Sequence, residues 1–315
     1  MRRDLILGTL IAVGALAIAL AAQQAPASMV IQIEKLKDNM FVLRGGGGNT
    51  TVFVQTNGVT VVDTKNPGWG QPLLNKIREF TGKPVTTVIN THSHFDHVSG
   101  NVDFPATVDI VVHENTAANI KAFRPVTSIT TTAVNVFAES GGRGLPKRTF
   151  RDTMTLGAGD DRVDLHYFGR GHTNGDAWVL FPAARVLAAG DIFSGKNLPL
   201  LDYDNGGTEA EIPDTLMRAY TATSKSVDSI VTGHSTVMTP NDLREYSDFN
   251  RDFRNAVFEA KKSGRSVDEF VKAWRIPDQY KGYAAPDPVR LRANVENIYK
   301  EARRAHQVQL QGRRN

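Results

Sequence analysis

A short run of histidine and aspartate residues is the part of this 315-residue chain with the most evident chemistry. It has the pattern His-x-His-x-Asp-His and runs from His92 to His97. In an extended segment alternate side chains share one face, so His92, His94 and Asp96 are expected to project together. His97 breaks that alternation, as expected of a loop that turns into a helix. Because imidazoles and carboxylates are metal ligands, this spacing predicts that one loop serves two metal ions.

Three further candidates lie later in the chain: His172, Asp191 and His234. Each one closes or follows a predicted strand and has glycine beside it, which permits close approach of the backbone. A single histidine at any of these places would more often be structural than a ligand. Together with the first motif, and in this order, the three residues predict one joint metal site. The remaining histidines lie in ordinary strand or helix contexts and are interpreted as structural: His113, His166 and His306.

The chain has eight histidines and no cysteine. The absence of cysteine excludes disulfides, thiolate catalysis, Fe–S clusters and every cysteine-containing zinc site. Any metal must therefore be held by histidine and carboxylate groups, a set that suits Zn²⁺ best, with Fe or Mn as alternatives. A metal-bound water has its pKa lowered from 15.7 towards about 7, so no serine or cysteine nucleophile is required.

Alternating strands and helices must position these residues. The segment from Val30 to Asp63 is predicted to be β-structure, because short β-branched runs alternate there with turn signals. Further strands are predicted at 85–90, 108–112, 162–168, 177–181, 186–189 and 229–232, and helices at 71–80, 115–123 and 212–222. The glycine run at 45–48 is predicted to be a tight turn, because a strand and not a helix follows it. The segment 124–150 is either a lid over the site or a plain surface insertion.

The two ends of the chain differ from its body. The N-terminus has the three parts of a secretory signal peptide: basic residues, an uncharged run from Leu5 to Ala22, and small residues of the kind found at a cleavage site. We therefore predict that this segment is cleaved and that the protein is periplasmic or secreted. An uncleaved membrane anchor is the alternative, since the run has the minimum length for crossing a bilayer. At the other end, apolar residues recur at helical spacing and predict a helix: Leu291, Val295, Ile298 and Ala302.

The formal net charge of +4 comes from these two ends. From Arg290 onward there are seven Lys or Arg residues against two Glu, and the body without the signal and this tail has 28 basic against 30 acidic residues. A nucleic-acid binder would carry a basic groove on its body. We therefore expect a small-molecule substrate, no nucleic acid, and membrane contact only through an uncleaved signal segment.

The motifs, in this order, resemble those of the metallo-β-lactamase superfamily, over about Val30 to His234. The resemblance implies an α/β fold, a four-layer αβ/βα sandwich with its metal site at one edge between two internal sheets, here with extra C-terminal helices. It also implies three parts: a signal peptide at 1–27, a metallo-β-lactamase-like hydrolase domain at 28–240, and a C-terminal helical extension at 241–315 packed on that domain.

The same resemblance implies roles for the candidate residues. The first metal would be held by His92, His94 and His172, the second by Asp96, His97 and His234, and Asp191 would bridge the two. Asp63, Thr91 and Asp176 would orient the imidazoles. As the catalytic candidate, Asp96 would also orient the nucleophile or pass a proton to the leaving group. Lys196, five residues after Asp191, is a candidate contact for an anionic substrate group, although a solvated surface charge is the more common role of such a lysine.

These assignments predict a dinuclear metal-dependent hydrolase that uses a metal-bound hydroxide on an ester-, thioester- or lactone-like substrate, with two Zn²⁺ as cofactors. Superfamily members that cleave β-lactams typically have Cys or Ser where this chain has Asp191. Two alternatives stay open: β-lactam hydrolysis, and a non-hydrolytic, iron-dependent enzyme similar to sulfur dioxygenases. A mononuclear dioxygenase needs only the first ligand group and Asp191, so the presence of the second group favours two metals.

Overall fold

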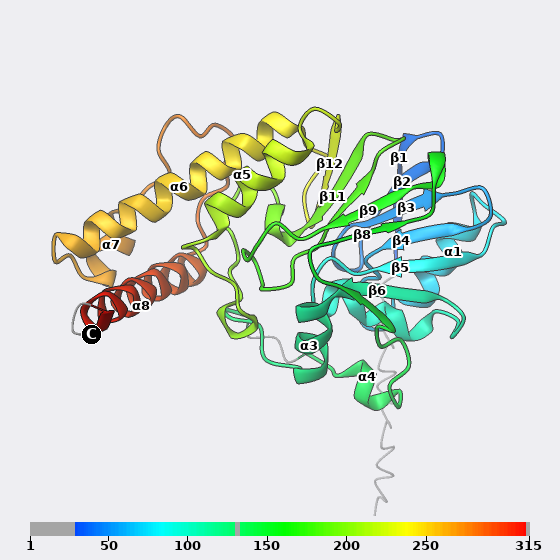
Figure 1. Cartoon of the computed structure of the whole chain (residues 1–315), viewed down its shortest axis with the longest axis horizontal. Coiled ribbons are helices and arrows are strands. Elements are labelled where there is room, and N and C mark those ends of the chain that lie inside the picture. The colour runs from blue at the N-terminus through cyan, green and yellow to red at the C-terminus, as the bar shows by residue number, and fades with distance from the viewer. Residues whose placement is uncertain (1–28, 130–132, 313–315) are drawn as a thin grey trace, which may run out of the picture.

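The computed structural model describes residues 29–129 and 133–312, with side chains as far as Glu301. The predicted signal segment at 1–27 lies outside these residues. Two sheets face each other, and helices cover their outer sides (Figure 1). The first sheet contains β1 (Gln32–Lys37), β2 (Met40–Arg44), β3 (Thr50–Val54), β4 (Val59–Val62), β5 (Val85–Ile89), β6 (Asp109–His113) and β7 (Arg148–Phe150), in that order. The second has the order β12 (Ser229–Thr232), β11 (Val186–Gly190), β10 (Trp178–Phe181), β9 (Val163–His166) and β8 (Thr153–Leu156).

The direction of the strands decides where their loops meet. In the first sheet β1 to β4 pair antiparallel, and β4 to β7 pair parallel. In the second sheet β11 and β12 are parallel, and the other pairs are antiparallel. Parallel neighbours end at the same edge of a sheet, so the loops after β4, β5, β11 and β12 can meet between the sheets.

Three buried apolar clusters separate four layers. One cluster fills the space between the sheets, with Val42 and Phe53 from the first sheet and Val179 and Ala188 from the second. A second cluster packs the outer face of the first sheet against a helix, and a third packs the outer face of the second sheet against helices. Because both faces of β10 are buried, its four residues are all apolar. The expected four-layer sandwich is therefore confirmed.

The outer layers are helical. On the first sheet lies α1 (Gly70–Arg78), which buries Leu73 and Ile77. Short helices follow in the connections: α2 (Phe95–Val98), α3 (Glu114–Ala122) and α4 (Val136–Glu139). On the second sheet lies α5 (Ile212–Thr223), and α6 (Pro240–Lys262) packs against it. The chain continues through α7 (Val267–Ala273) to α8 (Pro288–Gly312), which contacts both α6 and α7.

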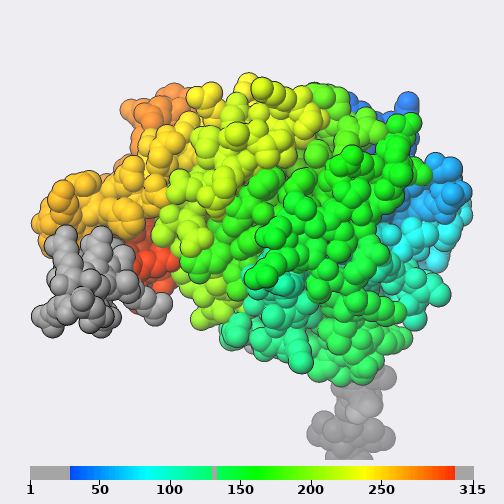
Figure 2. Space-filling model, in the orientation of Figure 1, coloured from blue at the N-terminus to red at the C-terminus, as the bar shows by residue number. Residues whose placement is uncertain are grey.

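The extra C-terminal helices share a core with the second sheet. Phe253 of α6 and Val295 of α8 belong to the same buried cluster as Trp178 of β10 and Leu187 of β11. Beyond that contact the helices extend away from the sandwich, and Figure 2 shows their yellow and orange surface projecting from it. The division of the chain at residue 240 stays a prediction. Within the described residues, no helix is both long and apolar enough to cross a membrane.

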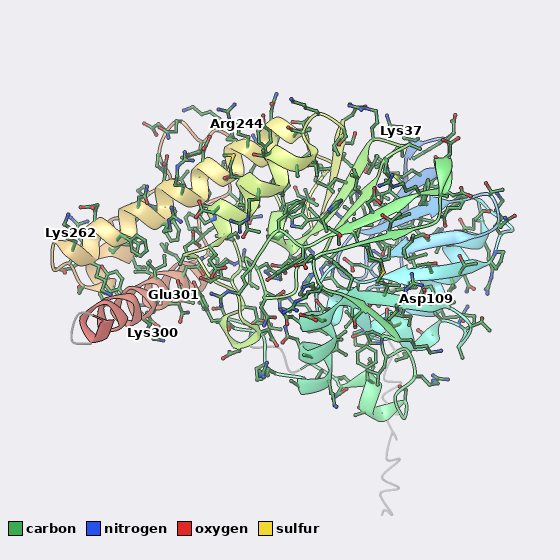
Figure 3. The ribbon with its side chains drawn as sticks, in the orientation of Figure 1. Lys37, Asp109, Arg244, Lys262, Lys300 and Glu301 are labelled. Carbon is green, nitrogen blue, oxygen red and sulfur yellow. The ribbon has the colours of Figure 1, made fainter. Side chains whose placement is uncertain are left out.

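Figure 3 labels several charged side chains. Lys37, Arg244 and Lys262 are exposed at the periphery of the molecule, on β1 and α6. The described residues of the segment 124–150 contain α4, and the segment ends in the edge strand β7, which pairs with β6. Its first part lies at the candidate site, where Val126 and Ile129 line a cavity.

Candidate metal centre

All seven predicted ligands lie together at one edge between the sheets. His92 and His94 follow β5, and the short helix α2 begins directly after His94 and carries Asp96 and His97. The remaining three come from the second sheet: His172 follows β9, Asp191 follows β11 and His234 follows β12. The turn from an extended strand end into α2 is what sends His97 in a different direction from His94.

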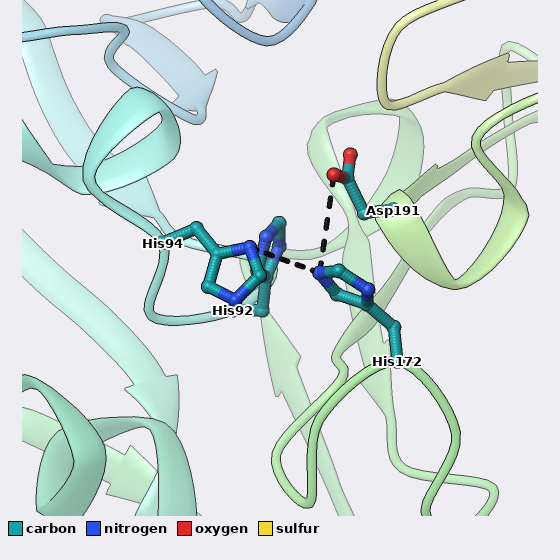
Figure 4. A group of neighbouring side chains, drawn as sticks. All are labelled: His92, His94, His172 and Asp191. Carbon is teal, nitrogen blue, oxygen red and sulfur yellow. Dashed lines mark hydrogen bonds and ion pairs between the residues drawn. The ribbon is translucent and has the colours of Figure 1, made fainter. Parts of the chain in front are cut away.

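The first group comprises His92, His94, His172 and Asp191, whose ligand atoms all lie within 4.8 Å of one another (Figure 4). His94 Nδ1 is 3.1 Å from His172 Nε2, and His172 Nε2 is 3.9 Å from Asp191 Oδ2. The three imidazoles are buried. This set of three histidines and one carboxylate is a donor set that suits a divalent metal ion.

The second group comprises Asp96, His97 and His234, again with all ligand atoms within 4.8 Å. His234 Nε2 is 3.1 Å from Asp96 Oδ2 and 3.3 Å from His97 Nε2. Asp191 joins the two groups, because its Oδ1 is 3.2 Å from His97 Nε2 and its Oδ2 is 3.3 Å from His234 Nε2. A carboxylate in contact with both groups is the arrangement that a bridging ligand requires.

Four of the imidazoles use one ring nitrogen for a protein partner and direct the other into the site. The outer partners are the Thr91 hydroxyl for His92, Asp202 for His94, Asp63 for His97 and the Leu200 carbonyl for His172, at 2.6–2.9 Å. Such partners fix the tautomer and orientation of metal-binding histidines. The inner nitrogen of His92, Nε2, is buried and has no hydrogen-bond partner among the described residues. A buried nitrogen without a partner is costly unless something binds it, so the residues fit a metal ion.

The protonation of the first group also suits metal binding, which requires neutral imidazoles. Burial, followed by the neighbouring His94, lowers the pKa of His172 to about 4. Burial and the neighbouring His97 lower the pKa of His92 well below its usual value. Both rings are therefore neutral near pH 7 and can each offer a lone pair. In the second group, burial opposes ionisation of Asp96, but the adjacent His97 and His234 hold its pKa at about 2.

Of the three residues predicted to orient imidazoles, two contact the rings or their partners. Asp63 accepts hydrogen bonds from the Thr91 backbone N–H and hydroxyl at 2.8 Å, and from His97 Nδ1 at 2.7 Å. Thr91 in turn contacts His92. Among the described residues Asp176 forms no hydrogen bond or ion pair with an imidazole. It accepts hydrogen bonds from the backbone N–H and hydroxyl of Thr173, and so holds the loop that carries His172. Burial raises the pKa of Asp176 to about 7.

Asp202, which no sequence motif indicates, is fully buried against His94. Its Oδ2 lies 2.8 Å from His94 Nε2, and its Oδ1 accepts hydrogen bonds from the backbone N–H and hydroxyl of Thr127. Burial disfavours its ionised form, but the hydrogen bond with His94 lowers its pKa well below the usual value. Asp202 therefore connects the segment that follows α3 to a predicted metal ligand. No motif could have revealed it, because it lies 108 residues from His94 in a turn-rich stretch.

We expect Asp202→Asn to reduce metal affinity or kcat by roughly 10–100-fold, the usual cost of removing a partner of a ligand histidine. The amide N–H₂ would face His94 Nε2 and favour the tautomer that is protonated at the site-facing nitrogen. Metal affinity is measured by competition with a chromophoric chelator, and kcat at saturating metal. Asp204→Asn is the matched control, because Asp204 also bonds the Thr127 hydroxyl. Equal behaviour of the two variants would contradict this role for Asp202.

The glycine run that connects β2 to β3 is a turn, as predicted, and it lies against the second ligand group. A Cβ at Gly48 would collide with the ring of His97, so only glycine allows this approach. The Gly48 carbonyl accepts a hydrogen bond from Lys65 Nζ at 2.7 Å, and burial lowers the pKa of Lys65 to about 7. The side-chain amide of Asn49 donates to the carbonyls of Thr232 and Ser235, on either side of His234. The turn thus helps to position both histidines of the second group.

A cavity of about 460 Å³ opens onto both ligand groups. Its wall contains four predicted ligands, His94, Asp96, Asp191 and His234, and these other residues: Asn66, Phe95, Val126, Ile129, Ser194, Asn197, Leu200 and Arg290. The predicted substrate contact Lys196 is not in this wall. Its ammonium group forms ion pairs with Asp242 at 3.2 Å and Glu245 at 3.0 Å, both on α6.

The amino-acid sequence is similar to those of known enzymes. A sequence model of the metallo-beta-lactamase superfamily matches residues 43–235. The metallo-beta-lactamase type 2 of Elizabethkingia meningoseptica is 27% identical over 221 residues, which are 65% of this chain and 78% of that protein. The hydroxyacylglutathione hydrolase of Nostoc punctiforme is 27% identical over 174 residues, 54% of this chain, and the match spans about half of that protein, 53%.

Solved structures show a similar fold. A metallo-beta-lactamase from Pontibacter korlensis superposes with a TM-score of 0.57 at 19% identity, over 70% of this chain and 99% of that one. A stereoselective inverting sec-alkylsulfatase, Pisa1 from Pseudomonas sp., superposes with a TM-score of 0.67 at 14% identity, over 86% of this chain and 50% of that one. At these identities the structures support the fold alone.

Proposed function

The chain belongs to the metallo-β-lactamase superfamily, and from that premise we propose that it is a dinuclear metal-dependent hydrolase of an ester-, thioester- or lactone-like substrate. The observation that carries this proposal is the pair of adjacent ligand groups joined by Asp191. His92, His94 and His172 would hold one ion, Asp96, His97 and His234 the other, and Asp191 would contact both. We propose Zn²⁺ for both ions, because histidine and carboxylate donors suit it best.

Zn²⁺ bound at such a site lowers the pKa of a coordinated water to about 7 and polarises a carbonyl group, and so supplies both the nucleophile and the electrophilic activation for hydrolysis. The protein's own residues provide orientation. Asp96 is ionised near neutral pH and lies in the cavity wall, so its carboxylate can accept a hydrogen bond from the attacking water. The apolar side chains of Phe95, Val126 and Leu200 lie in the same wall and can contact the apolar part of a substrate.

The identity of residue 191 supports an ester-like substrate over a β-lactam. Superfamily members that cleave β-lactams resemble this chain in the histidine motif, but typically carry Cys or Ser where Asp191 lies. β-Lactam hydrolysis is the second candidate, because a metallo-beta-lactamase type 2 is among the relatives of the chain. We further propose that the protein acts on a small molecule in the periplasm or outside the cell, on the basis of the signal-like sequence at residues 1–27.

The test is a hydrolytic panel on the purified chain loaded with Zn²⁺. It contains 4-nitrophenyl esters, acyl thioesters, lactones of several ring sizes and a chromogenic cephalosporin, each run with and without chelator. We expect chelator-sensitive hydrolysis of at least one ester, thioester or lactone, with weaker or no cleavage of the cephalosporin. The proposal would be overturned if the Zn²⁺-loaded chain hydrolysed nothing and the chain as purified held one iron and consumed oxygen with a persulfide as substrate. A cephalosporin as the best substrate would favour the second candidate.

A further inference from the structure

We propose that Arg290 binds a carboxylate on the substrate, so that the enzyme prefers an ester or thioester whose acyl chain ends in a carboxylate over its uncharged analogue. This inference rests on the proposed function and names the substrate class for the same site. Arg290 lies in the first turn of α8, and so belongs to the extra C-terminal helices, yet it lines the cavity at the metal centre. Among the described residues that form this wall, it is the only lysine or arginine.

The guanidinium of Arg290 is held in place without being neutralised. Its backbone N–H donates to Asp287 Oδ1 at 2.8 Å, which fixes the start of α8, and its Nη1 donates to the Leu198 carbonyl at 3.2 Å. It forms no ion pair within the described part of the chain. The basic residues nearby are different: Lys196 pairs with two carboxylates of α6, and Arg292 pairs with Asp268 at 2.6 Å. Arg290 therefore keeps most of its five N–H donors for a ligand.

The rest of the cavity wall suits an acyl chain that ends in an anion. The wall contains the ligand carboxylates Asp96 and Asp191 together with Arg290, and apolar side chains line the same space: Phe95, Val126, Ile129 and Leu200. A planar guanidinium recognises a carboxylate through two parallel hydrogen bonds, which gives both strength and orientation. A short aliphatic chain between the scissile carbonyl and a terminal carboxylate would satisfy the apolar wall and Arg290 together.

The experiment compares two esters of nearly equal shape, mono-4-nitrophenyl glutarate and 4-nitrophenyl valerate, on the Zn²⁺-loaded chain. We expect kcat/KM to be about 10-fold or more higher for the glutarate ester. Arg290→Gln should lower kcat/KM for that ester by roughly 10–100-fold, mainly through KM, and change the valerate ester by less than about twofold. Arg290→Lys should restore part of the preference. The matched control Arg292→Gln, on the same helix, should behave like the natural chain.

The affinity of the site for a carboxylate can be measured even if neither ester is a substrate. Calorimetry on the Zn²⁺-loaded chain should show tighter binding of glutarate than of valerate, and Arg290→Gln should remove that difference. If wild-type protein hydrolyses neither ester but shows this pattern, the proposed function fails at these substrates while the role of Arg290 stands. If both esters are hydrolysed, but Arg290→Gln affects them equally or not at all, the inference is overturned while the hydrolase proposal stands.

Discussion

Asp191→Ala is expected to abolish turnover, with a loss in kcat that exceeds the roughly 10–100-fold cost of removing a hydrogen-bond partner of a ligand histidine, because the change removes a proposed metal ligand itself. Asp191 is the residue that contacts both ligand groups, at 3.2 Å from His97 and 3.3 Å from His234, and it lies 3.9 Å from His172. Without its carboxylate the five imidazoles would face two cations with less compensating negative charge. We therefore expect the variant to bind fewer metal ions as well as to lose activity.

This loss must be separated from misfolding. Asp191 follows β11, a fully buried interior strand of the second sheet, so the far-UV circular dichroism and the cooperativity of thermal unfolding should be measured beside kcat and metal content. The replacement Asp160→Asn removes an exposed carboxylate at a distance from the motif and serves as the matched control. A folded Asp191→Ala protein with unchanged turnover would show that the metal centre is wrongly assigned.

Asp63→Asn is expected to weaken metal binding in both ligand groups, by roughly 10–100-fold in affinity. The Asp63 carboxylate accepts hydrogen bonds from Thr91, which contacts His92 of the first group, and from His97 of the second. An amide in its place offers one oxygen instead of two, so at least one of these donors loses its acceptor. If His97 loses it, the proton can move to Nε2 and block the nitrogen that faces the site.

Asparagine suits the backbone conformation at position 63. Asp63 has a backbone φ of +64°, which an aspartate or asparagine tolerates better than most residues, so Asp63→Asn keeps the backbone compatible with the fold. Stepwise titration with Zn²⁺ against a competing chelator measures the two affinities. Thr91→Ser, which keeps the hydroxyl, is expected to match the natural chain. If Asp63→Asn binds both ions as the natural chain does, the hydrogen bonds of Asp63 are not what orients the imidazoles.

The ligand residues could be predicted from the sequence because each one is marked by residues close to it along the chain. The spacing from His92 to His97 needs only one strand end and one helical turn, and each later ligand follows a strand and has an adjacent glycine. The principal strands were found for a similar reason: runs such as those of β10 and β11 are buried on both faces and therefore apolar throughout. By contrast, β8 was missed, since it is a partly exposed edge strand of only four residues.

Contacts between distant segments could not be predicted. Lys196 was a candidate because it lies five residues after Asp191, but α6 brings Asp242 and Glu245 to it. Arg290 was seen as part of a basic tail, and only the packing of α8 on the rest of the chain places it in the cavity wall. Asp202 and the Leu200 carbonyl likewise reach their histidines through a loop whose path no spacing rule determines.

The number of metal ions that the purified chain binds decides whether its centre is dinuclear. Elemental analysis by mass spectrometry, divided by an accurate protein concentration, should give close to two metal ions per chain after exposure to Zn²⁺. His234→Ala, which removes one ligand of the second group alone, should lower this value towards one. A natural chain that binds a single ion, and the same single ion in His234→Ala, would contradict the assignment of a dinuclear centre.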